Sequence, residues 1–245
     1  MYAFTRADIA NSICTYISAK SVPILTVTFT PFHKYFLTPM TENIYHRYLE
    51  LPFEYTKPTE FEKDLENDFI TYYSKDKVQQ NFLDWIQKHN LKISNVIEGF
   101  FTKTNGSIPI HNDTPIKPNE NDVCKLNFTW GPANSTTRWW KIKDESKYIE
   151  INHDQTDVNK SFEQAGIVPD IECYKCYSAD KDDLELVYEA VINKPSLMNV
   201  GQLHDTYNPD LENSRWTLSF TLLNMDGSHC TFKQATEIFK ESIDA

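Results

Sequence analysis

Short runs in which apolar and polar side chains alternate dominate the chain from residue 94 onward. This period of two is typical of strands with one buried face. Turn-forming pairs such as Asn105-Gly106 and Asn208-Pro209 separate the runs. The expected strands are Ser94–Thr102, Ile108–His111, Cys124–Trp130, Thr136–Ile142, Ile171–Tyr177, Leu184–Val191, Ser196–Val200, His204–Tyr207 and Arg215–Leu223. Short strands at regular spacing predict a mostly β fold, either a sandwich or a barrel.

The first 93 residues have a mixed texture. Val22–Phe32 is β-branched and aromatic between prolines, so we expect a strand there. Helices are expected at Thr41–Leu51, within Pro58–Tyr73, and from Ser74 to about Lys88, and a closing helix at Phe232–Ile243. The pattern therefore predicts an α+β chain in two parts. Residues 1–93 form a helical and strand-containing extension packed on a barrel, and residues 94–245 form the β core with its C-terminal helix.

Composition and charge narrow the class of protein. Hydrophobic residues make up 40% of the 245 residues and aromatic residues 13%, enough for a large buried core. The formal net charge of −11 repels phosphate, so duplex nucleic acid and anionic membranes are disfavoured partners. No apolar run reaches 18 residues, so no transmembrane helix is expected. The N-terminus lacks a secretory pattern and the five cysteines lack a stapling pattern, which favours the cytoplasm.

The apolar run Ile108–Ile110 ends in His111-Asn112-Asp113. Residues i and i+2 of an extended chain point to the same side, so His111 and Asp113 can bind one metal ion together. The best third ligand is His204, 91 residues after Asp113. Two histidines and one carboxylate on one face are the ligand set of non-haem Fe(II) oxygenases, and they leave positions open for other ligands.

A candidate anion site follows eleven residues after His204. Arg215 opens an alternating strand, so Arg215, Thr217 and Ser219 share one strand face. A guanidinium beside a hydroxyl group offers a planar pair of donors and one more donor, which suits a carboxylate.

These residues together resemble a known family. His111-x-Asp113, His204, and Arg215 followed by Thr217 are similar to the 2-oxoglutarate- and Fe(II)-dependent dioxygenases. The resemblance covers about residues 83–223. The segments NLKISNVIEGFF, VCKLNFTWG and TTRWWKI resemble a small branch of this family found in phages and marine microbes. Residues 1–82 have no recognisable counterpart.

The resemblance implies a double-stranded β-helix, a jelly-roll barrel of the cupin type, flanked by N-terminal helices. It implies that Fe(II) binds His111, Asp113 and His204, and that Arg215 and Thr217 hold the distal carboxylate of 2-oxoglutarate. Asn127 is a candidate contact to cosubstrate or substrate, with a strand-end polar residue as the open alternative. Dioxygen is the oxidant, and ascorbate is allowed as an accessory reductant.

The reaction implied is hydroxylation of a C–H bond with release of succinate and carbon dioxide. The substrate is unidentified, either a small molecule or a protein side chain. One alternative is a non-catalytic cupin-like binding module or a viral structural component. A second is a nucleic-acid-modifying hydroxylase, for which the sequence offers only scattered basic candidates: Lys125, Arg138, Lys141 and Lys143.

Two cysteines, two adjacent tryptophans and Asp205 are weaker candidates for a functional role. Cys173 and Cys176 form a single Cys-x-x-Cys, and a structural zinc site normally needs four ligands, so ordinary thiols are expected. One of Trp139 and Trp140 must face inward, with core packing favoured over a role in the pocket. Asp205 is expected to point away from His204, because neighbouring strand residues face opposite ways.

Overall fold

The computed structural model describes residues 43–62, 69–118 and 122–244. Eight strands build a barrel, and they are β3 (Leu91–Thr102), β4 (Gly106–His111), β5 (Cys124–Trp130), β6 (Thr136–Ile142), β9 (Leu184–Val191), β10 (Ser196–Asn199), β11 (His204–Asn208) and β12 (Arg215–Asn224). Three of these, β5, β6 and β9, have the bounds that alternation predicted.

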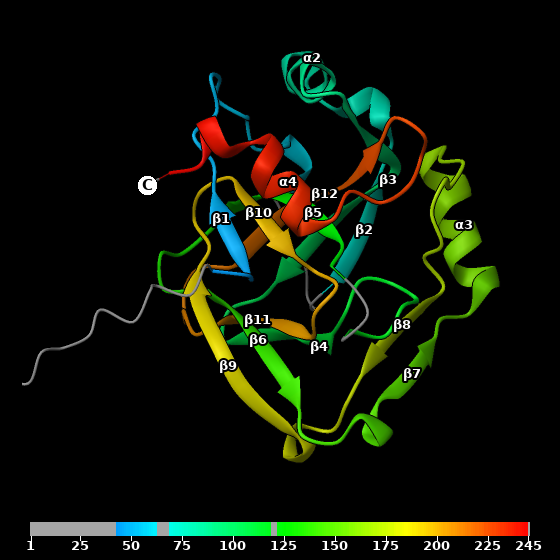
Figure 1. Cartoon of the computed structure of the whole chain (residues 1–245), viewed down its shortest axis with the longest axis vertical. Coiled ribbons are helices and arrows are strands. Elements are labelled where there is room, and N and C mark those ends of the chain that lie inside the picture. Colours follow the sequence, from blue (N-terminus) through cyan, green and yellow to red (C-terminus); the bar gives the residue numbers. More distant parts are fainter. Residues whose placement is uncertain (1–42, 63–68, 119–121, 245) are drawn as a thin grey trace, which may run out of the picture. The chain divides into compact units, whose positions relative to one another are not determined.

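The eight strands lie in two antiparallel sheets that face each other (Figure 1). One sheet contains the order β10-β5-β12-β3, and the other has the order β4-β11-β6-β9. Strands that follow each other in the chain therefore tend to fall in opposite sheets, as in a jelly roll. The predicted fold class, a mostly β double-stranded β-helix with flanking helices, is confirmed.

The larger sheet gains one strand at each edge. The edge strand β1 (His46–Tyr48) pairs with β10, and β2 (Phe69–Tyr73) pairs with β3. The helix expected at Thr41–Leu51 is therefore wrong in its described part, because an open sheet edge decides the structure of so short a segment. The helix expected within Pro58–Tyr73 is wrong at β2, and residues 63–68 of that segment lie outside the described residues. The strand expected at Val22–Phe32 also lies outside the described residues.

Two helices cover the outer face of the large sheet. They are α2 (Gln80–Lys88) and α4 (Phe232–Ile238), each shorter than the helix predicted there (Figure 1). Residues 42–245 form one compact unit. The division of the chain at residue 93 stays a prediction. No helix in the described ranges is long and apolar enough to cross a bilayer.

The main hydrophobic core lies outside the barrel, between the large sheet and its cover. Leu126 and Phe220 on the sheet and Phe82 on α2 belong to this cluster and are fully buried. The opposite, inward face of the same strands is polar, and Ser219 donates a hydrogen bond to Asn127 there, at 2.6 Å. A barrel interior lined by hydroxyl, amide and charged groups is suited to bind a polar ligand.

A long insertion between β6 and β9 adds a hairpin and a helix beside the barrel. Strands β7 (Ile149–Asn152) and β8 (Lys175–Ser178) pair with each other, and α3 (Gln155–Ala165) lies between them in the chain. Asp154 caps α3 at its start, and Gly166 ends the helix in the left-handed conformation at φ 69°. Neither α3 nor β7 was predicted, and the strand expected at Ile171–Tyr177 begins only at Lys175.

Candidate functional site

Three predicted ligands meet at one mouth of the barrel. His111 ends β4 and His204 begins β11, and these strands pair so that the two residues lie opposite each other. Asp113 follows in the loop after β4. Its Oδ1 lies 3.0 Å from Nε2 of His111 and 3.8 Å from Nε2 of His204. The three ligand atoms all lie within 4.8 Å of one another, which is close enough to bind one metal ion.

Backbone carbonyl groups orient both imidazole rings. Nδ1 of His111 donates to the carbonyl of Pro109 at 2.7 Å, and Nδ1 of His204 donates to that of Gln202 at 2.9 Å. A carbonyl oxygen can only accept, so each Nδ1 carries the proton. When a ring is neutral, its lone pair is therefore on Nε2, the usual arrangement of a metal-binding histidine. Nε2 of His111 donates to the ionised Asp113 only when that ring carries a second proton, which a metal ion would replace.

Asn112 holds the loop that carries Asp113. Its side chain is fully buried, donates to the carbonyl of Ile116 at 2.8 Å and accepts from the backbone N–H of Tyr177 at 2.7 Å. The backbone N–H of Asp113 donates to Val200 at 3.1 Å. The ligand is thus fixed by contacts to two other segments of the chain.

A buried ion pair holds the second oxygen of Asp113. Nζ of Lys125 lies 2.7 Å from Oδ2 and also contacts Oε2 of Glu98. Burial raises the pKa of Asp113, but the Lys125 charge and the His111 hydrogen bond outweigh it and hold that pKa well below its usual range. Asp113 is therefore ionised, and Oδ1 is left to face the two histidines.

The pKa values of the two histidines shift in opposite directions. Burial lowers the pKa of His204 to about 4. Burial also acts on His111, but the hydrogen bond and charge of Asp113 outweigh it, and the pKa of His111 is raised. Two imidazoles and one ionised carboxylate make a donor set that suits Fe(II) and related divalent ions. Within the described ranges, no other group of three such side chains comes this close together.

Arg215 lies in the same barrel interior and is 2% exposed. Its guanidinium makes two long contacts, 3.5 Å to the carbonyl of Thr136 and 3.4 Å to the hydroxyl of Thr137, and its Nε has no partner. No carboxylate of the described residues contributes to its pKa, which burial lowers to about 10. A buried cation without a counterion favours the binding of an anion, because a single charge is costly to bury alone.

A cavity connects Arg215 to the two histidines. Its lining comes from both sheets and consists of Phe100, Ile108, His111, Asn127, Thr137, Met198, His204, Thr206, Arg215 and Thr217. The structure thus brings the predicted residues Asn127, Thr217 and Arg215 to one cavity with His111 and His204. Asn127 is partly engaged, since its Oδ1 accepts from Ser219.

A second cavity opens on the other side of the cluster, and its volume including the open entrance is ≈ 680 Å³. Its lining consists of Ile70, Tyr72, Glu98, Phe100, His111, Asn112, Asp113, Lys125, His153, Val158, Ile171, Glu172, Cys173, Lys175 and Cys176. His111 and Phe100 line both cavities, so the cluster lies between them. Sequence reasoning missed Glu98 and named Lys125 only as a scattered basic residue. The usable signal was alternation, which puts Lys125 on the strand face of Asn127.

The remaining sequence candidates lie outside the cluster. Asp205 points away from His204 and binds Arg138 through two hydrogen bonds of 2.6 and 2.8 Å. Trp139 is fully buried and donates from Nε1 to the carbonyl of Asn199 at 3.1 Å, a packing role. Burial raises the pKa of the Cys173 thiol to about 12 and that of Cys176 to about 11, as for unreactive thiols.

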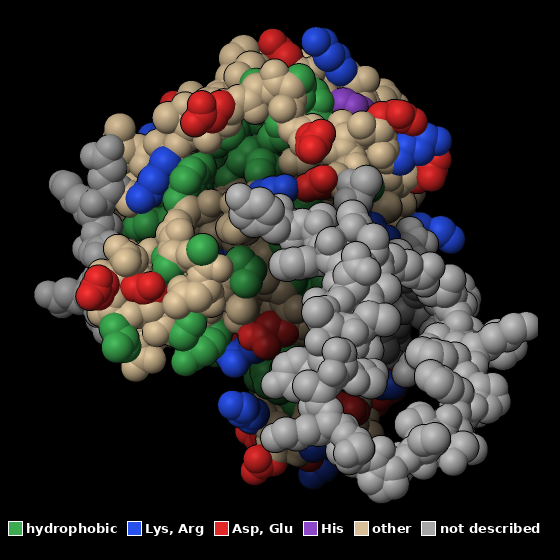
Figure 2. Space-filling model, turned by 90° about the vertical axis from the view of Figure 1, so that its left-hand side faces the viewer, with side chains coloured by type: hydrophobic (Ala, Val, Ile, Leu, Met, Phe, Trp, Pro, Cys, Tyr) green, Lys and Arg blue, Asp and Glu red, His purple; other side chains and the backbone are tan. Residues whose placement is uncertain are grey.

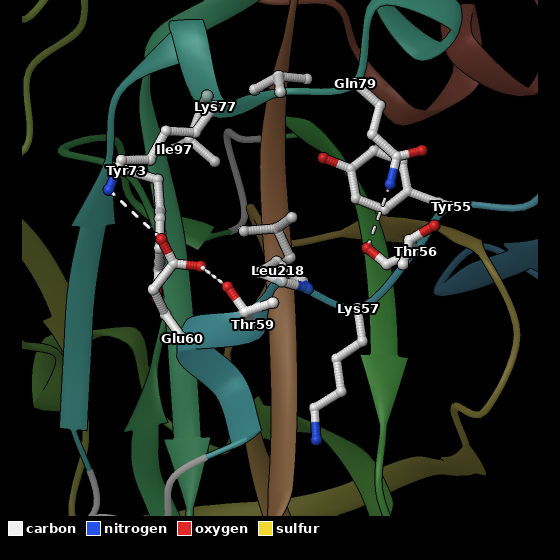
Figure 3. Close-up of a pocket in the computed structure, with 12 residues that line it drawn as sticks. Tyr55, Thr56, Lys57, Thr59, Glu60, Tyr73, Lys77, Gln79, Ile97 and Leu218 are labelled. Carbon is white, nitrogen blue, oxygen red and sulfur yellow. Dashed lines mark hydrogen bonds and ion pairs between the residues drawn. The ribbon is translucent and has the colours of Figure 1, made fainter.

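A third pocket is separate from the cluster. It lies on the outer face of the large sheet, where Ile97 and Leu218 form its floor and the Glu60–Lys77 ion pair spans its rim (Figure 3). Leu218 alternates with Thr217 along β12, so this pocket and the Arg215 cavity are on opposite faces of one sheet.

The surface charges do not form a patch of one sign on the face drawn in Figure 2. On its coloured part, acidic and basic side chains are interspersed.

Comparisons with known proteins give distant likenesses only. No protein-family model and no curated protein matches the chain. Among solved structures, EvdO2 from Micromonospora carbonacea var. aurantiaca aligns over 63% of this chain and 66% of its own, with a TM-score of 0.34 and 10% identity. An oxalate oxidase in complex with the substrate analogue glycolate aligns over 74% and 77%, with a TM-score of 0.29 and 9% identity. EvdMO1 aligns over 66% and 38%, with a TM-score of 0.30 and 14% identity. Likenesses this remote leave the function to be argued from the site.

Proposed function

We propose that this chain is an Fe(II)- and 2-oxoglutarate-dependent dioxygenase that hydroxylates a C–H bond. The observation that carries the proposal is a pairing of two features in one cavity. One is a His–Asp–His cluster whose two histidines line the cavity, with both Nε2 atoms turned to the carboxylate. The other is a buried guanidinium without a counterion. A metal site and an anion site in one small cavity suit a cosubstrate that bears a chelating end and a distal carboxylate.

Each side chain has a defined part in this proposal. His111, Asp113 and His204 hold the metal, and Lys125 keeps the second oxygen of Asp113 occupied. Arg215 and Thr217 hold the distal carboxylate of 2-oxoglutarate. When bound, Fe(II) with 2-oxoglutarate and dioxygen supplies the oxidising power that breaks the C–H bond, with succinate and carbon dioxide released.

Two observations bear on the alternatives. A non-catalytic binding module is favoured if Arg215 faces solvent or the three ligands diverge, and neither condition holds. A nucleic-acid-modifying enzyme is favoured by a basic groove beside the cluster. However, Lys125 is buried between two carboxylates, and Arg138 is bound to Asp205 on the face away from the cluster.

Anaerobic titration with Fe(II) and then 2-oxoglutarate tests the proposal. We expect one iron per chain and a visible charge-transfer band on adding 2-oxoglutarate. His111→Ala and His204→Ala each abolish iron binding, because two remaining ligands hold the ion poorly. His89→Ala is the matched control, since His89 lies at the end of α2 and packs on Trp85.

The outcomes separate the two parts of the proposal. Unchanged iron stoichiometry in both site variants contradicts the metal assignment. Iron binding without a band in the wild-type chain contradicts the cosubstrate. If both succeed, release of succinate from 2-oxoglutarate in air distinguishes an enzyme from a binding protein.

A further inference from the structure

The second cavity beside the cluster is lined by both apolar and charged side chains. Ile70, Phe100 and Ile171 are among its apolar lining residues, and Glu98 and Lys125 are the charged groups beside Asp113. Because Asp113 belongs to the proposed metal cluster, a molecule in this cavity lies against the reacting centre. The charges that still lack a partner in the cavity therefore indicate what kind of substrate it takes.

Both lysines in the lining already form ion pairs. Nζ of Lys125 is held between Asp113 and Glu98, and the lysine side chain is 3% exposed. Lys175 at the rim is paired with Glu150 at 2.6 Å. Neither lysine is therefore available to bind an anionic substrate without breaking an existing ion pair.

The carboxylates of the lining are not fully used. Glu98 contacts Lys125 through Oε2, while its Oε1 makes no hydrogen bond within the described part of the chain. The Glu98 side chain is 16% exposed, against 3% for Lys125, so Glu98 is the more accessible member of the pair. Glu172 is exposed at the rim and forms no ion pair with the described residues.

We propose that this cavity binds a substrate with an aliphatic ammonium group, whose nitrogen contacts Glu98 and whose stem lies against Ile70, Phe100 and Ile171. The reaction on that stem rests on the proposed function, whereas the charge preference depends only on the cavity. Burial raises the pKa of Glu98 even with Lys125 beside it, so a second cation at the free oxygen is favourable. The net charge of −11 draws cations to the protein at long range.

A series of three ligands of equal length tests the charge preference: pentylamine, pentanol and pentanoate. Affinities are measured at pH 7 by ligand-observed NMR on the metal-free chain, and by perturbation of the charge-transfer band on the anaerobic Fe(II)–2-oxoglutarate complex. We expect the amine to bind at least about tenfold tighter than the alcohol, because it adds a charge-assisted hydrogen bond. On the Fe(II)–2-oxoglutarate complex, in which Arg215 is already occupied, pentanoate should bind more weakly than the alcohol.

Two variants locate the preference within the cavity. Glu98→Gln should bring the amine to the affinity of the alcohol and leave the alcohol unchanged. Glu172→Gln is the matched control, and it should change the amine affinity by less than about threefold, since an exposed charge contributes little. A fourth ligand, N-acetyl-lysine methylamide, binds more tightly than pentylamine if the group belongs to a peptide and more weakly if it belongs to a free amine.

Two results overturn the inference: pentanoate that binds the Fe(II)–2-oxoglutarate complex as tightly as pentylamine does, or an amine preference over the alcohol that persists in Glu98→Gln. The wild-type series decides even if Glu98→Gln fails to fold. An amine preference without a charge-transfer band supports the cavity assignment and removes the dioxygenase. A band without an amine preference does the reverse.

Discussion

Replacing Arg215 by methionine should stabilise the ligand-free chain while removing its anion site. Arg215 is 2% exposed, the two contacts of its guanidinium are 3.4 and 3.5 Å long, and its Nε has no partner. Arg215 remains charged at pH 7, so the chain does not avoid the cost by releasing the proton. Methionine retains most of the apolar stem and has no charge.

The magnitude follows from the burial of the charge. Burial lowers the pKa of Arg215 from 12.5 to about 10. This corresponds to about 3 kcal/mol of destabilisation of the charged form in the folded chain. Relaxation around the new side chain reduces the gain, so we expect Arg215→Met to raise the free energy of unfolding by about 1–3 kcal/mol.

Urea unfolding at pH 7, followed by tryptophan fluorescence, measures this difference on the metal-free chain. With Fe(II) present under anaerobic conditions, 2-oxoglutarate at a hundredfold excess over its wild-type Kd should then shift the difference by about 2 kcal/mol in favour of the wild-type chain. The wild-type chain gains about 2.7 kcal/mol at a hundredfold excess of ligand over Kd. The variant gains little, because loss of a bidentate charge-assisted pair weakens binding by at least about thirtyfold.

Arg138→Met is the matched control and should change stability in the opposite direction. Arg138 makes two hydrogen bonds to Asp205, whose side chain is 5% exposed, so the variant leaves a buried carboxylate without its cation. If Arg215→Met instead lowers the free energy of unfolding by more than about 1 kcal/mol, the Arg215 charge is compensated in the ligand-free chain. The argument for an anion site at this position then fails.

Two further predictions concern other buried groups. His46 is buried against Trp139, and burial with the nearby Arg47 lowers its pKa to about 4, so its neutral form belongs to the folded chain. As the pH falls, His46 takes up a proton in the unfolded chain before it does so in the folded chain, so the folded chain loses stability. Between pH 6.5 and 4 the wild-type chain should lose up to about 3 kcal/mol more stability than His46→Phe, as measured by urea unfolding across that range. Equal pH dependence of the two chains contradicts this. Asn112→Ala should cost about 2–4 kcal/mol and weaken iron binding, because buried partners of the amide are left unsatisfied; iron affinity unchanged in a destabilised variant shows that Asp113 is fixed by other contacts.

Local patterns in the chain were sufficient to predict the strands of the barrel. Alternating apolar and polar residues marked β5, β6 and β9 with their observed bounds. In β6 the buried positions Thr137 and Trp139 follow that period of two. Prediction was poorest where a segment has no strong period of its own. The short edge strand β1 exists because β10 offers an open edge, and no window around His46 contains that information.

The sequence by itself also selected the candidate site residues, but not what surrounds them. Spacing and residue type selected His111, Asp113, His204 and Arg215. Only the tertiary structure decided that strand pairing puts His204 opposite His111 and that Arg215 has no counterion. It alone placed Lys125 between Asp113 and Glu98. These relations depend on which strands become neighbours in the sheets. Strands that are far apart in the chain can pair by hydrogen bonds, and the sequence separation of two side chains then does not predict whether they are in contact.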